Sequence, residues 1–331
     1  YSGEEAAALW KQYGNCFLII LSYSWLSVKH PDPDLFHLKR LVPFLKELRH
    51  EFGKATGLRQ ELGIIIDFCS LFQNMSNENG GESRTAEQLQ VFQKGLNVIN
   101  TPYAHRDVTA VKLTGTPDDE KRTYDSRGWT LFESRVIDCK GTGMLPQSQG
   151  YKMEHYCKVK NPGAYNVFVV EEADADSDSD DSDDARGGRR MDELRIGRRP
   201  PCNSSRFCEE LAQRKKLADE NNVRLFTNGK DHPFVEKKYE ETYQKFLQTD
   251  LYNFSSMALS DSFMSELSVV LHDFKSLTEL NLANNEIGAE GAAALAQALK
   301  VNRSIAAMYF KTNGIGAEGA AALAKALEVN T

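Results

Sequence analysis

Short apolar runs alternate with longer amphipathic stretches in the first part of the chain. Residues 16–21 and 62–66 are continuous apolar runs rich in β-branched side chains, which is typical of buried parallel strands. Between them, large apolar residues recur at helical spacing. These residues are Leu35, Leu38, Leu41, Val42, Leu45, Leu48 and Phe52. The pattern therefore predicts a strand, a crossover helix and a second parallel strand.

The alternation of helical and strand patterns continues. Residues 86–100 carry apolar side chains on one helical face, residues 107–113 alternate like a third strand, and the segment around Trp129 has helical spacing. This order predicts an α/β fold with a doubly wound, mostly parallel sheet of the flavodoxin-like kind. Ligands bind such sheets in a crevice outside the carboxyl ends of the strands. The polar segments that would meet there are residues 22–25, 67–70 and 114–127.

A hairpin is expected to complete this first domain. Residues 151–159 and 165–170 are rich in Tyr and Val, and they flank an Asn-Pro-Gly turn signal at residues 161–163. We therefore place the first domain at residues 1–170. Two helical patterns farther along the chain predict a helical bridge over residues 204–248, with Ser204 or Ser205 as the first cap.

The negative charge of the chain is concentrated in one tract. The formal net charge is −7, from 47 acids and 40 bases. Residues 171–184 hold nine acids and no base, so the rest of the chain has 38 acids against 40 bases. Six arginines follow the tract, at 186, 189, 190, 195, 198 and 199. We expect a disordered linker over residues 171–203, acidic and then basic. No aromatic residues are interleaved with the arginines, so nucleic-acid binding is not the favoured interpretation.

The end of the sequence repeats itself with a period of 28 residues. Residues 277–304 and 305–331 align in register, and a shift back by one more period gives a degenerate repeat at residues 249–276. The matched positions are Leu280/Met308, Leu282/Phe310, Asn285/Asn313, Ile287/Ile315, Leu295/Leu323 and Leu299/Leu327. Such a period is typical of solenoid proteins. We interpret residues 249–276 as a capping repeat and expect the array to continue beyond Thr331.

These repeats resemble leucine-rich repeats of the ribonuclease-inhibitor type. The resemblance implies a short strand with Leu282 inward, an asparagine that bonds the turn between coils, and an Ala-rich helix with Leu295 inward. It also implies a protein partner on the exposed strand face. The candidate partner-binding residues are Glu279, Asn281, Ala307 and Tyr309.

Three landmarks of the first domain resemble Toll/interleukin-receptor (TIR) domains and the related heterokaryon-incompatibility (HET) domains. They are the sequences FLIILSYSW, IIIDF and SRGWTLFES. In TIR enzymes a Trp-Cys-x-x-Glu helix carries the glutamate needed to cleave the nicotinamide–ribose bond of NAD. Trp129 and Glu133 match the outer positions of that motif, whereas Thr130 stands where the Cys is usual. The resemblance thus implies NAD as a substrate and Glu133 as the candidate catalytic residue.

The same resemblance suggests which residues would surround the ligand. The candidate ligand-binding residues are Ser22, Tyr23, Trp25, Asp67 and Trp129. The alternative interpretation of the motif is structural, with Trp129 as a packing anchor and Glu133 as a solvated or capping acid.

Composition favours a cytoplasmic protein. The chain is 41% hydrophobic and its longest apolar run is about six residues, far shorter than a membrane span. Six cysteines lack paired CxxC spacing and fall mostly on apolar segments, so we expect reduced thiols. The histidines are scattered without HxxxH spacing, so no metal site is predicted.

The sequence is therefore consistent with two functions of different classes. The first is an intracellular receptor or adaptor that binds a protein through its repeats and signals through a TIR-like domain, which could also self-associate. The second is an NAD hydrolase whose α/β domain is controlled by the repeats. The repeats argue for binding directly, whereas catalysis depends on Glu133 alone, so the first is favoured.

Overall fold

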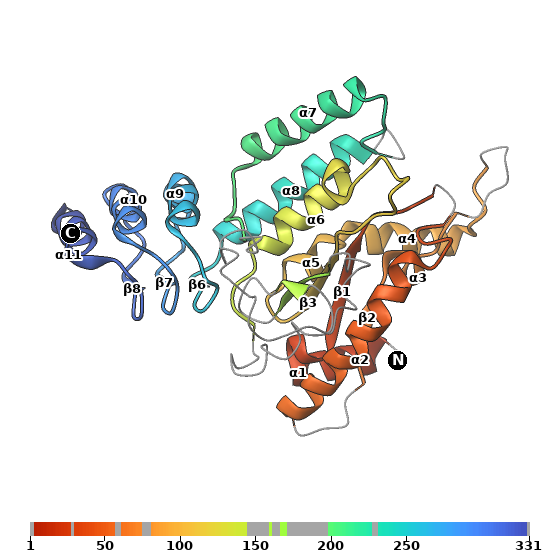
Figure 1. The fold of residues 1–331 in the computed structure, drawn as a ribbon, viewed down its shortest axis with the longest axis horizontal. Helices are drawn as coiled ribbons and strands as arrows, with labels where there is room; N and C mark the ends of the chain where they lie inside the picture. Colours follow the sequence, from red (N-terminus) through yellow and green to blue (C-terminus); the bar gives the residue numbers. More distant parts are fainter. Residues whose placement is uncertain are drawn as a thin grey trace, which may run out of the picture.

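The protein contains one mostly parallel sheet and one parallel sheet, with helices packed against them (Figure 1). The structure is a computed structural model, and it describes residues 3–27, 30–56, 61–74, 81–143, 159–160, 166–170, 198–226 and 231–329. One sheet has the strand order β2-β1-β3-β5-β4, and the other has the order β6-β7-β8. The predicted mixed α/β class is confirmed.

Four strands of the larger sheet are parallel. They are β1 (Leu18–Tyr23), β2 (Gly63–Ile65), β3 (Thr109–Leu113) and β5 (Val167–Val170). The short strand β4 (Val159–Lys160) pairs antiparallel with β5, as the predicted hairpin requires. The turn predicted at residues 161–163 lies outside the described residues. The expectation that the second strand is buried is wrong, because β2 is the edge strand and Ile64 is 38% exposed.

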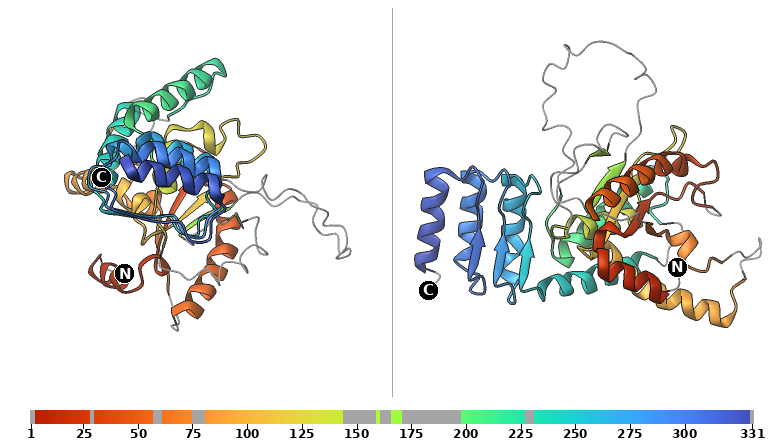
Figure 2. Two further views of the ribbon diagram at one scale, coloured as in Figure 1. Left: turned by 90° about the vertical axis from the view of Figure 1, so that its left-hand side faces the viewer. Right: turned by 90° about the horizontal axis from the view of Figure 1, so that it is seen from below.

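Helices cover both faces of this sheet (Figure 2). Ile19 and Leu21 of β1 pack with α2 (Phe36–Thr56), whereas Ile20 packs on the opposite face. That face is covered by α5 (Asn100–Ala104) and α6 (Gly128–Asp138). Successive strand residues point to opposite faces, so one apolar strand supplies two cores. The other elements of this part are α1 (Gly3–Tyr13), η1 (Gly14–Cys16), α3 (Asp67–Ser70), α4 (Ala86–Asn97) and η2 (Tyr124–Ser126).

Two later helices form an outer layer over α6. They are α7 (Ser204–Glu220), whose cap is Asn203, and α8 (Asp231–Leu247). Phe207 of α7 stacks on Tyr239 of α8 with ring centroids 3.9 Å apart, and both side chains belong to the core that contains Ile20 of β1. Residues 204–248 therefore do more than bridge two domains, because they complete the core of the α/β unit.

The basic end of the expected linker is packed into the α/β unit. Arg198 is 5% exposed, and its guanidinium donates to the Lys140 carbonyl (2.8 Å) and to Asn166 Oδ1 (2.7 Å). Buried guanidinium groups are stable when oxygen acceptors satisfy their N–H donors. The expectation of disorder is thus wrong for residues 198–203, while residues 171–197 lie outside the described residues.

Three strand–helix coils follow α8 at the predicted period. The strands are β6 (Leu251–Asn253), β7 (Glu279–Asn281) and β8 (Ala307–Tyr309), and their register joins Tyr252, Leu280 and Met308. The helices are α9 (Asp261–Val270), followed by η5 (Leu271–Asp273), then α10 (Ala289–Leu299) and α11 (Gly316–Val329). The degenerate repeat at residues 249–276 supplies the first coil. As predicted, Leu282 and Leu295 are fully buried.

Asparagines link each coil to the one before it. Asn285 Oδ1 accepts from the Met257 and Leu259 amides, and its Nδ2 donates to the Phe254 carbonyl. One period later, Asn313 accepts from the Ile287 amide and donates to the Leu282 carbonyl. These bonds satisfy backbone groups that the turns leave unpaired. The role predicted for the repeated asparagine is confirmed.

The first coil is attached directly to the α/β unit. The Thr142 amide, just after α6, donates to the Asn253 carbonyl of β6 at 2.7 Å. Tyr243 Oη of α8 donates to Asp273 Oδ2 at 2.7 Å, and Phe246 and Leu247 pack against the core of the repeats. Figure 1 shows that α8 leads straight into β6. The coils therefore stack onto a surface that α6 and α8 provide.

Equivalent leucines of successive repeats offer a matched test of this packing. Leu299 is 1% exposed because α11 covers it, whereas Leu327, one period later, is 54% exposed. We expect Leu299→Ala to lower the free energy of unfolding by about 2–5 kcal/mol, through lost apolar contacts and a cavity. Leu327→Ala should change it by less than about 0.5 kcal/mol. Urea denaturation of both variants measures the difference, and equal losses would contradict the register.

Candidate functional site at the carboxyl ends of the strands

The structure brings Glu133 to the carboxyl end of β1. Ser22 points toward α6, and its hydroxyl donates to Glu133 Oε2 at 2.5 Å. The same Ser22 oxygen is 2.5 Å from the hydroxyl of Tyr124, which lies in η2 just before α6. The Tyr103 hydroxyl of α5 donates to the Leu21 carbonyl beside them. The predicted proximity of Ser22 and Glu133 is therefore present, and two tyrosines that the sequence did not suggest complete the cluster.

Burial changes the acidity of Glu133. Burial, and to a smaller extent the charge of Asp67, raises the pKa of the Glu133 carboxyl to about 8, although hydrogen bonds with Ser22 and Tyr103 act in the opposite direction. Burial also raises the pKa of Tyr103 and of Tyr124. A carboxyl with this pKa is mostly protonated at neutral pH, so it can donate a hydrogen bond as well as accept one.

Asp67 organises a second group of predicted residues. It is the first residue of α3, directly after β2. Tyr23 Oη donates to Asp67 Oδ1 at 2.6 Å, and Trp25 Nε1 donates to Oδ2 at 3.1 Å. Burial and the neighbouring Asp67 raise the pKa of Tyr23. Tyr23 lies in the core on the α2 face of the sheet, so this group and the Ser22 cluster occupy opposite faces of β1.

Trp129 contacts the outer helix α8. Its Nε1 donates to Asp231 Oδ2 at 3.0 Å, and its ring lies 6.0 Å from Phe234 of α8 and 6.1 Å from Phe132. These contacts correspond to the structural interpretation, in which Trp129 is a packing anchor. They attach the first turn of α6 to the first turn of α8.

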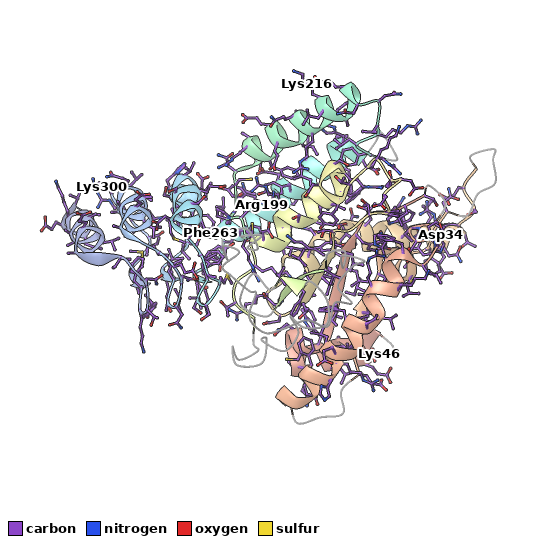
Figure 3. The ribbon with its side chains drawn as sticks, in the orientation of Figure 1. Asp34, Lys46, Arg199, Lys216, Phe263 and Lys300 are labelled. Carbon is purple, nitrogen blue, oxygen red and sulfur yellow. The ribbon has the colours of Figure 1, made fainter. Side chains whose placement is uncertain are left out.

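A pocket of about 470 Å³ opens between the loops that follow β1 and β3. This is the topological switch point of the sheet. The chain places β2 on one side of β1 and then returns to place β3 on the other side. The lining residues are Leu26, Pro33, Asp34, Phe36, Lys39, Arg40, Pro117, Asp119 and Glu120. Figure 3 labels Asp34 in the loop before α2.

The pocket lining differs from the predicted site. The Arg40 guanidinium lies 3.5 Å from the centroid of the Phe36 ring, and Glu120 pairs with Arg127 at 3.2 Å. Arg127 in turn donates to the Trp25 carbonyl, so the pocket borders the loop that carries Trp25. None of the individual catalytic and ligand-binding candidates lines the pocket, although Pro117, Asp119 and Glu120 belong to the segment 114–127 that was expected at the crevice. The sequence signal that could have indicated this pocket is the pair of adjacent bases Lys39 and Arg40, near the start of the helix that follows the first strand.

The predicted partner-binding residues lie together on the smaller sheet. Glu279 and Asn281 on β7 and Ala307 on β8 are partly exposed, and Tyr309 is 46% exposed. They alternate with Leu280 and Met308, which point toward the core of the repeats. The period-2 pattern of the strands therefore produces one exposed strip across β7 and β8.

Comparison with known proteins identifies part of the repeat region. Residues 275–296 match a leucine-rich repeat family model. This stretch contains β7 and most of α10, so the match supports the predicted leucine-rich repeat. No TIR or HET family model is detected in the chain. No curated protein matches it.

The described part of the chain was searched for membrane-spanning helices and for groups of metal-binding side chains. No helix there is long and apolar enough to cross a membrane. Within the same ranges, no group of three His, Cys, Asp or Glu side chains could hold a metal ion.

The raised pKa of Glu133 predicts a pH-dependent stability. Between pH 4.5 and about 8 the folded protein keeps a proton that the unfolded chain has lost, so Glu133 makes stability fall as pH rises through this window. Glu133→Gln removes this contribution. We expect the variant to match the wild type near pH 4.5 and to exceed it above pH 8, by a few kcal/mol at most. Urea denaturation at several pH values tests this, and parallel pH profiles would contradict it.

Proposed function

We propose that this protein is an intracellular receptor or adaptor that binds a protein partner through the exposed strip of β7 and β8. The observation that carries the proposal is the strip itself, Glu279, Asn281, Ala307 and Tyr309, held on a leucine-rich repeat. Leucine-rich repeats commonly mediate protein–protein interaction. The described cysteines are free thiols, which supports an intracellular location.

The chemistry of the strip suits a protein partner. Tyr309 offers an exposed aromatic ring with a hydroxyl, and tyrosines are enriched among the residues that dominate binding energy at interfaces. Glu279 adds a charge that would orient a partner of opposite charge. The strands beneath are fixed by buried leucines, so little ordering of the backbone would be needed on binding.

The α/β unit would act as the signalling part of such a receptor. This part of the proposal rests on an analogy of fold, because the unit has helices on both faces of a mostly parallel sheet. In this proposal the unit signals by association with partners or with a second copy. The contacts of Thr142 and Tyr243 with the first coil would keep the two parts in fixed orientation during binding.

A second candidate function is NAD hydrolysis at Glu133. The specific observation in its favour is a partly accessible glutamate with a strongly shifted pKa at the carboxyl end of β1, where α/β sheets bind ligands. Cleavage of the nicotinamide–ribose bond develops positive charge on the ribose, which an ionised carboxylate would stabilise. The positive charge of a bound nicotinamide would itself favour ionisation of Glu133.

The binding proposal predicts that loss of the strip abolishes partner capture. The variant Glu279→Ala/Tyr309→Ala removes a charge and a ring without emptying the core, so stability should stay within about 1 kcal/mol of the wild type. Proximity labelling in cells measures capture for the wild type, this variant and a Lys300→Ala control at the C-cap of α10. We expect a partner that the control keeps and the strip variant loses at least tenfold. A partner retained by the strip variant would place the binding surface elsewhere.

The enzymatic alternative has its own test. Purified protein is incubated with NAD, and free nicotinamide is measured for the wild type and for Glu133→Gln, which keeps the shape of the side chain but cannot ionise. If the α/β unit is a hydrolase, the variant should be slower by about 100-fold or more, as expected for loss of a charge that stabilises the transition state. Equal rates would remove Glu133 from the mechanism, and no release by either protein would leave the binding function alone.

A further inference from the structure

Three arginines surround one glutamate between α6 and α7. Arg135 of α6 forms a short pair with Glu210 of α7, with Nη2 and Oε2 2.7 Å apart. Arg199, which precedes α7, and Arg214, one turn after Glu210, face the other carboxylate oxygen at 3.6 and 3.8 Å. Figure 3 labels Arg199 between the start of α7 and α6. We call these four residues the α6–α7 arginine cluster.

The cluster has more N–H donors than its acceptors use. Arg135 gives Nε and Nη2 to Glu210, while its buried Nη1 has no hydrogen-bond partner in the described part of the chain. Arg199 gives Nε to Asp138 and Nη2 to Ser134, so only Nη1 faces Glu210, and beyond hydrogen-bond distance. Arg214 has its 3.8 Å ion pair with Glu210 and no hydrogen bond among the described residues. A guanidinium carries five N–H donors, so each of the three arginines keeps donors that no acceptor among the described residues uses.

The charges of the cluster are also unbalanced toward the cations. Behind it, Asp138 is shared between Arg199 and the buried Lys112. The exposed Asp125 also acts electrostatically on Arg199 and Arg214. Among the described residues, four cations, Lys112, Arg135, Arg199 and Arg214, therefore stand against three carboxylates, Asp125, Asp138 and Glu210. Arg198 lies close enough to Lys112 to lower the pKa of the lysine, which adds positive potential from the interior.

We propose that the α6–α7 arginine cluster is a binding site for the phosphate group of a phosphomonoester. A tetrahedral dianion presents several oxygens at once, and these can accept the outward N–H groups of two or three guanidinium forks. A carboxylate ligand carries one charge and two oxygens, and Glu210 already fills that role. The anion would sit beside Glu210, across the long contacts of Arg199 and Arg214.

The cluster is accessible from one side. The side chains of Glu210, Arg214 and Arg199 are 21%, 23% and 28% exposed, whereas that of Arg135 is 7% exposed. Arg135 thus forms the floor, and the other two arginines form the rim. Free phosphate or a phosphorylated side chain on a peptide could both reach such a site. The shared ligand chemistry is the phosphate dianion, and the experiment separates its two sources.

The test measures phosphate affinity with a matched charge control on the same helix. The full chain is titrated by calorimetry at constant ionic strength with inorganic phosphate, and separately with a phosphoserine peptide and its unphosphorylated form. Arg214→Gln removes a rim donor that makes no hydrogen bond, so the fold should be retained, as circular dichroism can verify. Lys216→Gln removes the same charge from a side chain that is 78% exposed on the outer surface of α7.

We expect the wild type and Lys216→Gln to bind phosphate equally and Arg214→Gln to bind at least tenfold more weakly. If the phosphoserine peptide binds more tightly than inorganic phosphate, the ligand is a phosphorylated protein segment, and the reverse order indicates a free phosphate compound. Absence of phosphate binding by the folded wild type would overturn the site. Equal weakening by the Arg214 and Lys216 variants would overturn it as well, because the effect would then come from overall charge.

Discussion

Helix α6 is held on the sheet by buried polar contacts, and much of the remaining structure depends on its position. Ser22 of β1 bonds Glu133, and Lys112 of β3 pairs with Asp138 at 2.5 Å. Burying such groups is favourable only when each one finds its partner, so these contacts fix both the height and the rotation of the helix. Trp129 then orients α8, and the residues after Asp138 meet the first repeat. One helix therefore aligns the sheet, the outer helices and the repeats.

The sequence was informative wherever a single period determined the structure. The apolar runs located β1 and β2, the alternation over residues 107–113 located β3, and the spacing of leucines located α2. The 28-residue period placed Leu282 and Asn285 in their observed roles. The proximity of Ser22 and Glu133 also followed from a general rule. The carboxyl ends of parallel strands share one edge of the sheet, and the helix that carries Glu133 begins after the loop at that edge. Periodicity reports which face of an element is buried, but it does not identify the element that covers it.

The features that the sequence did not predict depend on partners distant in the chain. Trp129 donates to Asp231, 102 residues later, and no pattern around either residue indicates the pairing. Arg198 belongs by composition to a basic linker, yet it is buried because Lys140 and Asn166 provide acceptors. Ile64 lies in an apolar run that suits a central strand, but strand order placed it at an edge. In each case the tertiary structure, and not the local sequence, determines the environment of the residue.

The shared core of the sheet and α7–α8 means that the α/β unit is discontinuous in sequence. Residues that precede the acidic tract and residues that follow it pack into one hydrophobic cluster, in which Phe207 and Tyr239 cover α6. A recombinant fragment that stops at residue 170 would expose this apolar surface to water and invite aggregation. The smallest autonomous unit suggested by the packing runs from Gly3 to Leu247. Any study of the α/β part in isolation would accordingly have to retain both outer helices.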